Sequence, residues 1–253
     1  MTIFRYDQLK QFLIHTRDAR GISTVGDWKG SHVVILRHDV DLSITSAHRL
    51  ARVERECDVR SSFFIMMTHL TYNPFFHENG RMIREIADWG FEVGLHFDPT
   101  AYGICSKDEM SSHLEAEAKR LGELSGKPVR SVSLHNPTVF ADSYEKYPFF
   151  PGFMNAYDPR IFGPDRYLSD SRMVFRHDVY SFVERMRDHP VQILLHPEFY
   201  SEEGGTYADT MYGFVREFLG QMDVVYQVNS SYNEQVKNEL FAYLHARIIG
   251  GER

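Results

Sequence analysis

The sequence predicts an α/β fold in which helices cover a mainly parallel sheet. Short, continuously apolar runs predict buried strands, and helical patterns lie between several of them. Apolar strands that alternate with helices are typical of parallel sheets buried on both faces. Six or seven such strands in 253 residues suit a barrel or a doubly wound sheet. Because no linker-like stretch interrupts the chain, we expect one domain over residues 1–253.

Each element is predicted from its own local pattern. The predicted strands are residues 33–36, 63–67, 91–95, 129–134, 167–168 and 191–195. Leu9, Phe12 and Leu13 lie on one helix face near the start of the chain. Ser106 and Glu109 form a capping box for a helix that Gly126 ends, and another helix ends at Gly90. An apolar stripe over 211–222 and a closing helix over 233–249 predict C-terminal helices within 206–250, beyond a motif-bearing core of about 31–200.

Composition excludes several classes of function. The 28 Lys and Arg against 35 Asp and Glu give a net charge of −7, which argues against general nucleic-acid or anionic-membrane binding. No apolar run approaches the roughly 18 residues of a membrane span. The first 16 residues carry charges and no apolar signal region, so we expect a cytoplasmic protein. With two Cys and 13 His, any metal must be held by His and carboxylates.

Polar residues, chiefly His and Asp, follow five of the predicted strands. The carboxyl ends of parallel strands meet on one face of the fold, and that face holds the active site in such proteins. We therefore expect these polar clusters to converge although they are far apart in the sequence. Their central residues are Asp39 with Asp41, His96, His135, Asp170 and His196.

The two carboxylates of the first cluster are expected to repel each other, and a bound metal ion would relieve that repulsion. Asp39 and Asp41 point to the same side of an extended strand, where two carboxylates repel each other unless a cation lies between them. A divalent cation held by Asp41 and His96 fits this arrangement, with Asp39 near a water on the metal. Zinc suits mixed nitrogen and oxygen ligands. Asp39 as general base and His196 as general acid would complete the hydrolysis of an amide or ester.

Three segments resemble a known enzyme family. Asp39-Val40-Asp41, residues 92–96 and Leu194-Leu195-His196-Pro197 resemble motifs of the polysaccharide deacetylases (NodB homology, carbohydrate esterase family 4). The likeness is greatest to a divergent, WbmS-like branch found among O-antigen biosynthesis proteins, and it covers roughly residues 33–200. It implies a single distorted (β/α)7 TIM-like barrel. It also implies that Asp39 is the catalytic base, Asp41 and His96 are metal ligands, and His196 is the general acid.

The chain departs from the family pattern in its second motif. The family has a second His four residues after the first, but Thr100 stands there, so the third ligand is missing from its usual place. His135 is a candidate replacement, although it could instead orient Asp39, and Asp98 is the other local option.

A later segment is expected to support the site. The segment that contains Asp170 and Arg172 stands where the family supplies supporting contacts. These two residues could hold His196 or the substrate, or form a structural ion pair with each other.

The resemblance implies a metal-dependent deacetylase that acts on the carbon–nitrogen bond of an N-acetylated sugar during surface-polysaccharide (O-antigen) synthesis. The sugar would be linked to a nucleotide or a lipid, and the metal would most simply be zinc. The alternatives are another metal-dependent barrel hydrolase of amides or phosphoesters, and a non-catalytic sugar-binding relative. The missing second His favours the last of these.

Overall fold

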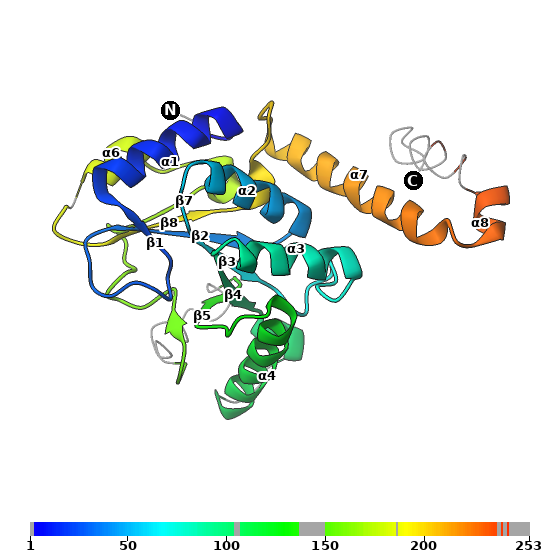
Figure 1. The fold of residues 1–253 in the computed structure, drawn as a ribbon, viewed down its shortest axis with the longest axis horizontal. Helices are drawn as coiled ribbons and strands as arrows, with labels where there is room; N and C mark the ends of the chain where they lie inside the picture. The colour runs from blue at the N-terminus through cyan, green and yellow to red at the C-terminus, as the bar shows by residue number, and fades with distance from the viewer. Residues whose placement is uncertain are drawn as a thin grey trace. The chain divides into compact units, whose positions relative to one another are not determined.

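A parallel β-sheet forms the centre of the structure, a computed structural model that describes residues 3–103, 107–136, 150–185 and 187–236, with Glu239 and Ala242. The chain divides into two compact units, Met1–Tyr207 and Ala208–Arg253. All strands of the described residues lie in the first unit. Figure 1 shows the fold with its helices and strands labelled.

The sheet is parallel throughout. Its strands are β1 (Ile22–Ser23), β2 (Val34–Val40), β3 (Ser62–Ile65), β4 (Glu92–Phe97), β5 (Ser131–Leu134), β6 (Met154–Asn155), β7 (Tyr167–Ser169) and β8 (Val191–Leu195). The order is β6-β5-β4-β3-β2-β8-β7, and β1 pairs with β2. Within the described residues β6 and β7 do not pair with each other, so the sheet curls as a half-barrel without closing. The predicted α/β fold with a distorted barrel is confirmed.

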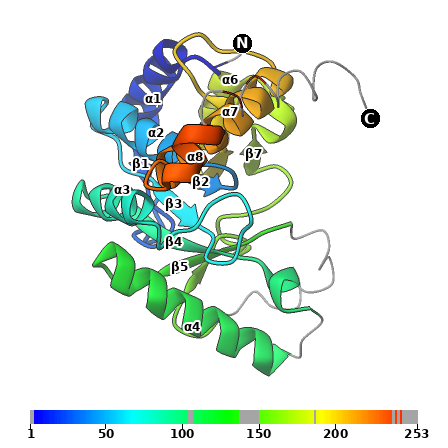
Figure 2. The same ribbon diagram turned by 90° about the vertical axis from the view of Figure 1, so that its right-hand side faces the viewer.

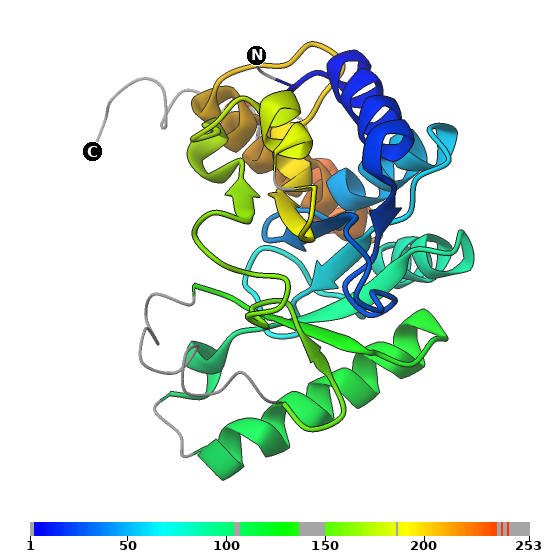
Figure 3. The same ribbon diagram turned by 90° about the vertical axis from the view of Figure 1, so that its left-hand side faces the viewer.

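Helices cover the outer face of this sheet. They are α1 (Tyr6–Arg20), α2 (Ile44–Glu56), α3 (His77–Asp88), α4 (Lys107–Ser125) and α6 (Val179–Glu184). Figure 2 shows α1 to α4 in succession along one side of the strands, and Figure 3 shows them from the opposite direction. The helix that was predicted to end at Gly126 is α4, and Gly126 follows it with a φ of 76°. Ser106, its predicted cap, lies outside the described residues.

Strand β2 shows how alternation separates the core from the site. Val34, Leu36 and Val40 belong to the large apolar core, which also includes helix residues, whereas Ile35 belongs to a small cluster on the inner face. Side chains on a strand alternate between its two faces. Arg37 and Asp39 therefore share the inner face with Ile35, and every residue of β2 is buried.

The six predicted strands are present; β8 has the predicted bounds, and the ends of the others are shifted. β2 continues to Val40 and β4 to Phe97, so His38, Asp39 and His96 lie inside strands instead of after them. The polar side chains are tolerated there because they find buried partners, as His38 does in Glu54 at 2.7 Å. This contact also places His38 on the face opposite to Asp39, as the alternation of side chains along a strand requires. The two-residue strands β1 and β6 are too short to leave a periodic signal.

The described part of the second unit is helical. The apolar stripe over 211–222 lies in α7 (Tyr207–Tyr226), and α8 spans Ser230–Gln235. Most of the closing helix predicted over 233–249 lies outside the described residues. Among the helices that the structure describes, none is long and apolar enough to cross a membrane.

Candidate active site

Residues from three strand ends meet at the carboxyl edge of the sheet. Asp41 follows β2, His96 lies in β4 and His196 follows β8. His96 Nε2 is 3.2 Å from Asp41 Oδ1, and His196 Nε2 is 3.8 Å from Asp41 Oδ2. Burial would raise the pKa of Asp41, but the neighbouring imidazoles, first of all His96, lower it. The structure thus brings together one carboxylate and two imidazoles from positions 155 residues apart.

Asp39 is held by a buried cation. The Arg37 side chain is fully buried, and its Nη2 donates to Asp39 Oδ2 at 3.3 Å and to the Tyr157 hydroxyl at 3.2 Å. Burial would lower the pKa of Arg37, but Asp39 and the neighbouring tyrosines raise it, so Arg37 remains charged. Ser133 donates to the same Asp39 oxygen at 3.4 Å, and Asp39 Oδ1 has no hydrogen-bond partner. Asp39 therefore has one oxygen fixed and one available.

Each of the three site histidines is anchored through Nδ1. His96 Nδ1 donates to the Ser133 carbonyl at 3.1 Å. His135 Nδ1 contacts Asp98 Oδ2 at 3.2 Å, and His196 Nδ1 contacts an Asp170 oxygen at 2.6 Å. A carbonyl or carboxylate at Nδ1 leaves the lone pair of a neutral imidazole on Nε2.

Asp170 is the anchor of His196. It is fully buried and accepts from the His196 ring, from the His196 backbone N–H at 2.9 Å and from the Tyr200 hydroxyl at 3.0 Å. Burial opposes protonation of His196, but the Asp170 carboxylate raises its pKa to about 10. His196 therefore carries a proton at neutral pH. Arg172, also predicted here, is exposed and makes no ion pair with Asp170 in the part of the chain that the structure describes.

Asp98 is fixed by Thr100, the residue four positions after His96. Thr100 donates to Asp98 Oδ1 from its backbone N–H at 2.9 Å and from its hydroxyl at 2.6 Å. Burial would raise the pKa of Asp98, but these hydrogen bonds and His135 lower it. Asp98 therefore stays ionised beside His135.

The sequence analysis missed two residues of this site, Arg37 and Glu198. Arg37 precedes Asp39 by two positions on the same strand face, so alternation was a signal that pointed to it. The Glu198 Oε2 atom is buried without a hydrogen-bond partner, and burial together with the charge of Asp41 raises the pKa of Glu198 to about 8. His69 lies outside this set, anchored on Thr71 at 2.7 Å, with its ring centre 5.7 Å from that of His135. No sequence pattern pointed to Glu198.

The donor atoms of this site suit a divalent cation in kind, although they are not arranged around one. No group of three His, Cys, Asp or Glu side chains among the described residues is already arranged as a metal site. The donors nevertheless fit one in chemistry. His96 Nε2 and Asp41 Oδ1 are 3.2 Å apart, yet Asp41 Oδ1 has no hydrogen-bond partner by geometry. Two ligand atoms of one tetrahedral zinc lie roughly 3.3 Å apart, given Zn–N and Zn–O distances of about 2.0–2.1 Å.

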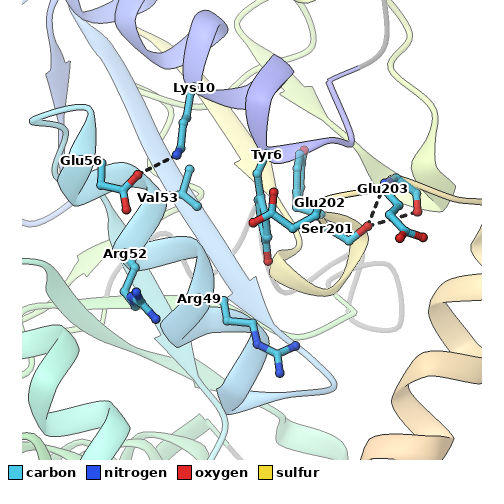
Figure 4. A pocket seen from close by; sticks show the side chains of 11 residues that line it. Tyr6, Lys10, Arg49, Arg52, Val53, Glu56, Ser201, Glu202 and Glu203 are labelled. Atoms are coloured by element: carbon cyan, nitrogen blue, oxygen red, sulfur yellow. Dashed lines mark hydrogen bonds and ion pairs between the residues drawn. The ribbon is translucent and has the colours of Figure 1, made fainter.

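A groove of about 560 Å³ lies elsewhere on the first unit, between α1, α2 and residues 200–204. Figure 4 shows the side chains that line it, among them Lys10, Arg49 and Arg52. Lys10 pairs with Glu56 at 2.6 Å, and the groove holds equal numbers of cationic and acidic side chains. No predicted site residue lines this groove.

Comparison with known proteins shows similarity at the level of structure only. The chain matches no family model and no curated protein. Among solved structures, it is similar to a family 4 carbohydrate esterase from Bacillus anthracis (17% identity, 84% of this chain and 86% of that chain, TM-score 0.43). A family 4 carbohydrate esterase from Streptomyces lividans in complex with acetate is 15% identical, with 77% and 91% covered and a TM-score of 0.44.

A third similar structure is a CE4 family pseudoenzyme from Bacillus anthracis (18% identity, 75% of this chain covered, TM-score 0.39). The chain spans 61% of the length of that protein and 63% of two of its mutants. These scores are too low to support a conclusion about activity, which must rest on the residues of this chain. The chain is similar in structure, at low sequence identity, to family 4 carbohydrate esterases.

Proposed function

We propose that this chain is a metal-dependent hydrolase that removes the acetyl group from an N-acetylated sugar. The observation that carries the proposal is the meeting of Asp39, Asp41 and His96 with the His196–Asp170 pair at one edge of the sheet. Hydrolysis of an amide needs a base that takes a proton from water and an acid that gives one to the leaving amine. At this edge of the sheet, Asp39 is available as the base and His196 as the acid.

Asp39 is suited to the role of base. Arg37 fixes one of its oxygens, while Oδ1 has no partner and is free to accept a proton. Water adds to the acetyl carbonyl carbon as its proton passes to Asp39. A divalent cation, which Asp41 and His96 would hold, supplies polarisation of that carbonyl when it is bound.

His196 is suited to the role of acid. Asp170 fixes its ring and favours its protonated form. As the carbon–nitrogen bond breaks, the leaving nitrogen takes the proton from Nε2. The products are acetate and the free amine of the sugar. The three motif-like segments support a surface-polysaccharide sugar, linked to a nucleotide or lipid and processed in the cytoplasm, as the substrate.

Elemental analysis combined with acetate release from N-acetylated sugars tests the proposal. We expect the purified protein to contain a divalent metal. Asp39→Asn should abolish turnover and retain metal, whereas Asp41→Asn should lose both. Asp158→Asn is the matched control, because Asp158 pairs with Arg160 at 2.7 Å and takes no part in the site. Near-full activity of Asp39→Asn would refute the assigned base.

One observation favours a second candidate, a non-catalytic sugar-binding protein. The described residues contain no arranged group of three metal-binding side chains, and Thr100 replaces a ligand of the family pattern. Sugar binding without bound metal and without acetate release, in protein purified without chelators, would establish this alternative.

A further inference from the structure

We propose that His135 is the third protein ligand of the metal, and that Asp98 and Thr100 position its ring. The proposal rests on the metal dependence of the proposed function, and it explains how the chain manages without a histidine at position 100. A metal-binding histidine usually donates its second ring N–H to a carboxylate or a carbonyl, which fixes the tautomer and the ring orientation. His96 and His135 both show this arrangement.

A chain of three hydrogen-bonded residues holds the His135 ring. The Thr100 N–H and hydroxyl fix Asp98 Oδ1, and Asp98 Oδ2 accepts from His135 Nδ1. His135 Nε2 is then the nitrogen that carries the lone pair, and its one neighbour at hydrogen-bonding distance among the described residues is the Asn136 side-chain nitrogen at 3.2 Å. Thr100 stands at the position of the family's second histidine ligand. In this chain it does not bind the metal itself but orients His135 through Asp98.

The position of His135 relative to His96 agrees with a shared metal. The two ring centres are 5.3 Å apart and the rings are nearly perpendicular, at 80°. Two imidazoles that bind one tetrahedral zinc through Nε2 have ring centres roughly 5.2 Å apart, because each Zn–N distance is about 2.0–2.1 Å. Asp41 lies against His96 Nε2, and His135 is near enough for its charge to act on Asp41 as well.

The geometry disfavours the alternatives. Asp98 accepts two hydrogen bonds from Thr100 on Oδ1 and one from His135 on Oδ2, which fits a residue that supports a ligand better than it fits a ligand. Asp39 takes its hydrogen bonds from Arg37 and Ser133, so it does not need His135 to orient it.

Asn136 does not occupy the free nitrogen of His135. Its side-chain nitrogen is 3.2 Å from His135 Nε2 and 3.4 Å from Nδ1. An atom that is nearly equidistant from both ring nitrogens is not directed along the lone pair of either.

Zinc affinity, measured by competition with a chromophoric chelator, tests the assignment without any substrate. Starting from protein stripped of metal, we expect His135→Ala and His135→Gln to weaken Zn²⁺ binding at least 100-fold. Asp98→Asn should weaken it 10- to 100-fold, as loss of a carboxylate behind a ligand does. Thr100→Val, which removes only the hydroxyl, should weaken it less. Circular dichroism checks that each variant is folded, and His135 is not part of the apolar core clusters of the described residues.

His69→Ala is the matched control, because it removes an imidazole that also borders His135 but is anchored on Thr71 at 2.7 Å. Its Zn²⁺ affinity should stay within about threefold of the wild type. Wild-type affinity in both His135 variants, a large loss in His69→Ala, or no Zn²⁺ uptake by the wild type would overturn the assignment. His135-dependent Zn²⁺ binding without acetate release would instead refute the proposed function and leave His135 as a ligand.

Discussion

Replacement of Arg37 by Met should be strongly destabilising, because it leaves Asp39 as an unpaired buried charge. Arg37 is fully buried and Asp39 is 4% exposed. The substitution removes a charge-assisted hydrogen bond, worth about 1.5–3 kcal/mol, and a cation–π contact with Tyr157 at 4.9 Å, worth about 2 kcal/mol when desolvated. We expect a loss of about 3–5 kcal/mol, the usual cost of removing one partner of a buried ion pair.

A double-mutant cycle separates this effect from the loss of packing. Urea unfolding is measured for the wild type, Arg37→Met, Asp39→Asn and the double variant at pH 7. Because the double variant has no unpaired buried charge, it should be more stable than the sum of the single losses predicts, by at least about 1.5 kcal/mol. Arg81→Met, which removes an exposed cation paired with Glu78 and Glu85, should leave the unfolding midpoint unchanged.

Two results would refute this reasoning. Additive losses in the cycle would show that the charges of Arg37 and Asp39 do not depend on each other. A loss under about 1 kcal/mol in Arg37→Met would show that solvent or another group compensates Asp39.

Three further predictions concern the acid and the inner face of the sheet. Asp170 raises the pKa of His196 to about 10, so Asp170→Asn should move the alkaline limb of the kcat/KM profile at least one unit lower; an unmoved limb would contradict the assigned acid. Because this pKa is raised from 6.5, the stabilisation by the pair is complete below pH 6.5 and is lost as the pH rises to about 10. The urea midpoints of wild type and Asp170→Asn should therefore converge over that range, and a constant gap would disprove the linkage. Gly94→Ala places a Cβ 2.5 Å from the Phe64 ring and should cost about 1–3 kcal/mol in urea unfolding, whereas Gly213→Ala, with open space around it, should cost nothing; equal effects would show that the close approach is relieved.

Much of the site followed from strand periodicity. Because a strand alternates its side chains, Asp39 and Asp41 had to share a face, and His38 had to face the helices. The same rule placed Arg37 beside them, but nothing local indicated that Arg37 would be the partner of Asp39. The pairing of Arg37 with Asp39 also involves Tyr157 and Ser133, which other parts of the chain bring to the inner face.

The sequence by itself determined the class of fold and the strand ends that carry His and Asp, because apolar periodicity and the polar residues that follow it are local properties. It left open whether His135 or Asp98 completes the site and whether Arg172 takes part. Only the tertiary structure decided which atoms meet. Asp98 and His135 are 37 residues apart in the sequence, and Asp170 and His196 are 26 residues apart. The register of neighbouring strands brings each pair into contact. These side-chain contacts depend on how neighbouring strands are aligned, and the local sequence of either strand does not specify that alignment.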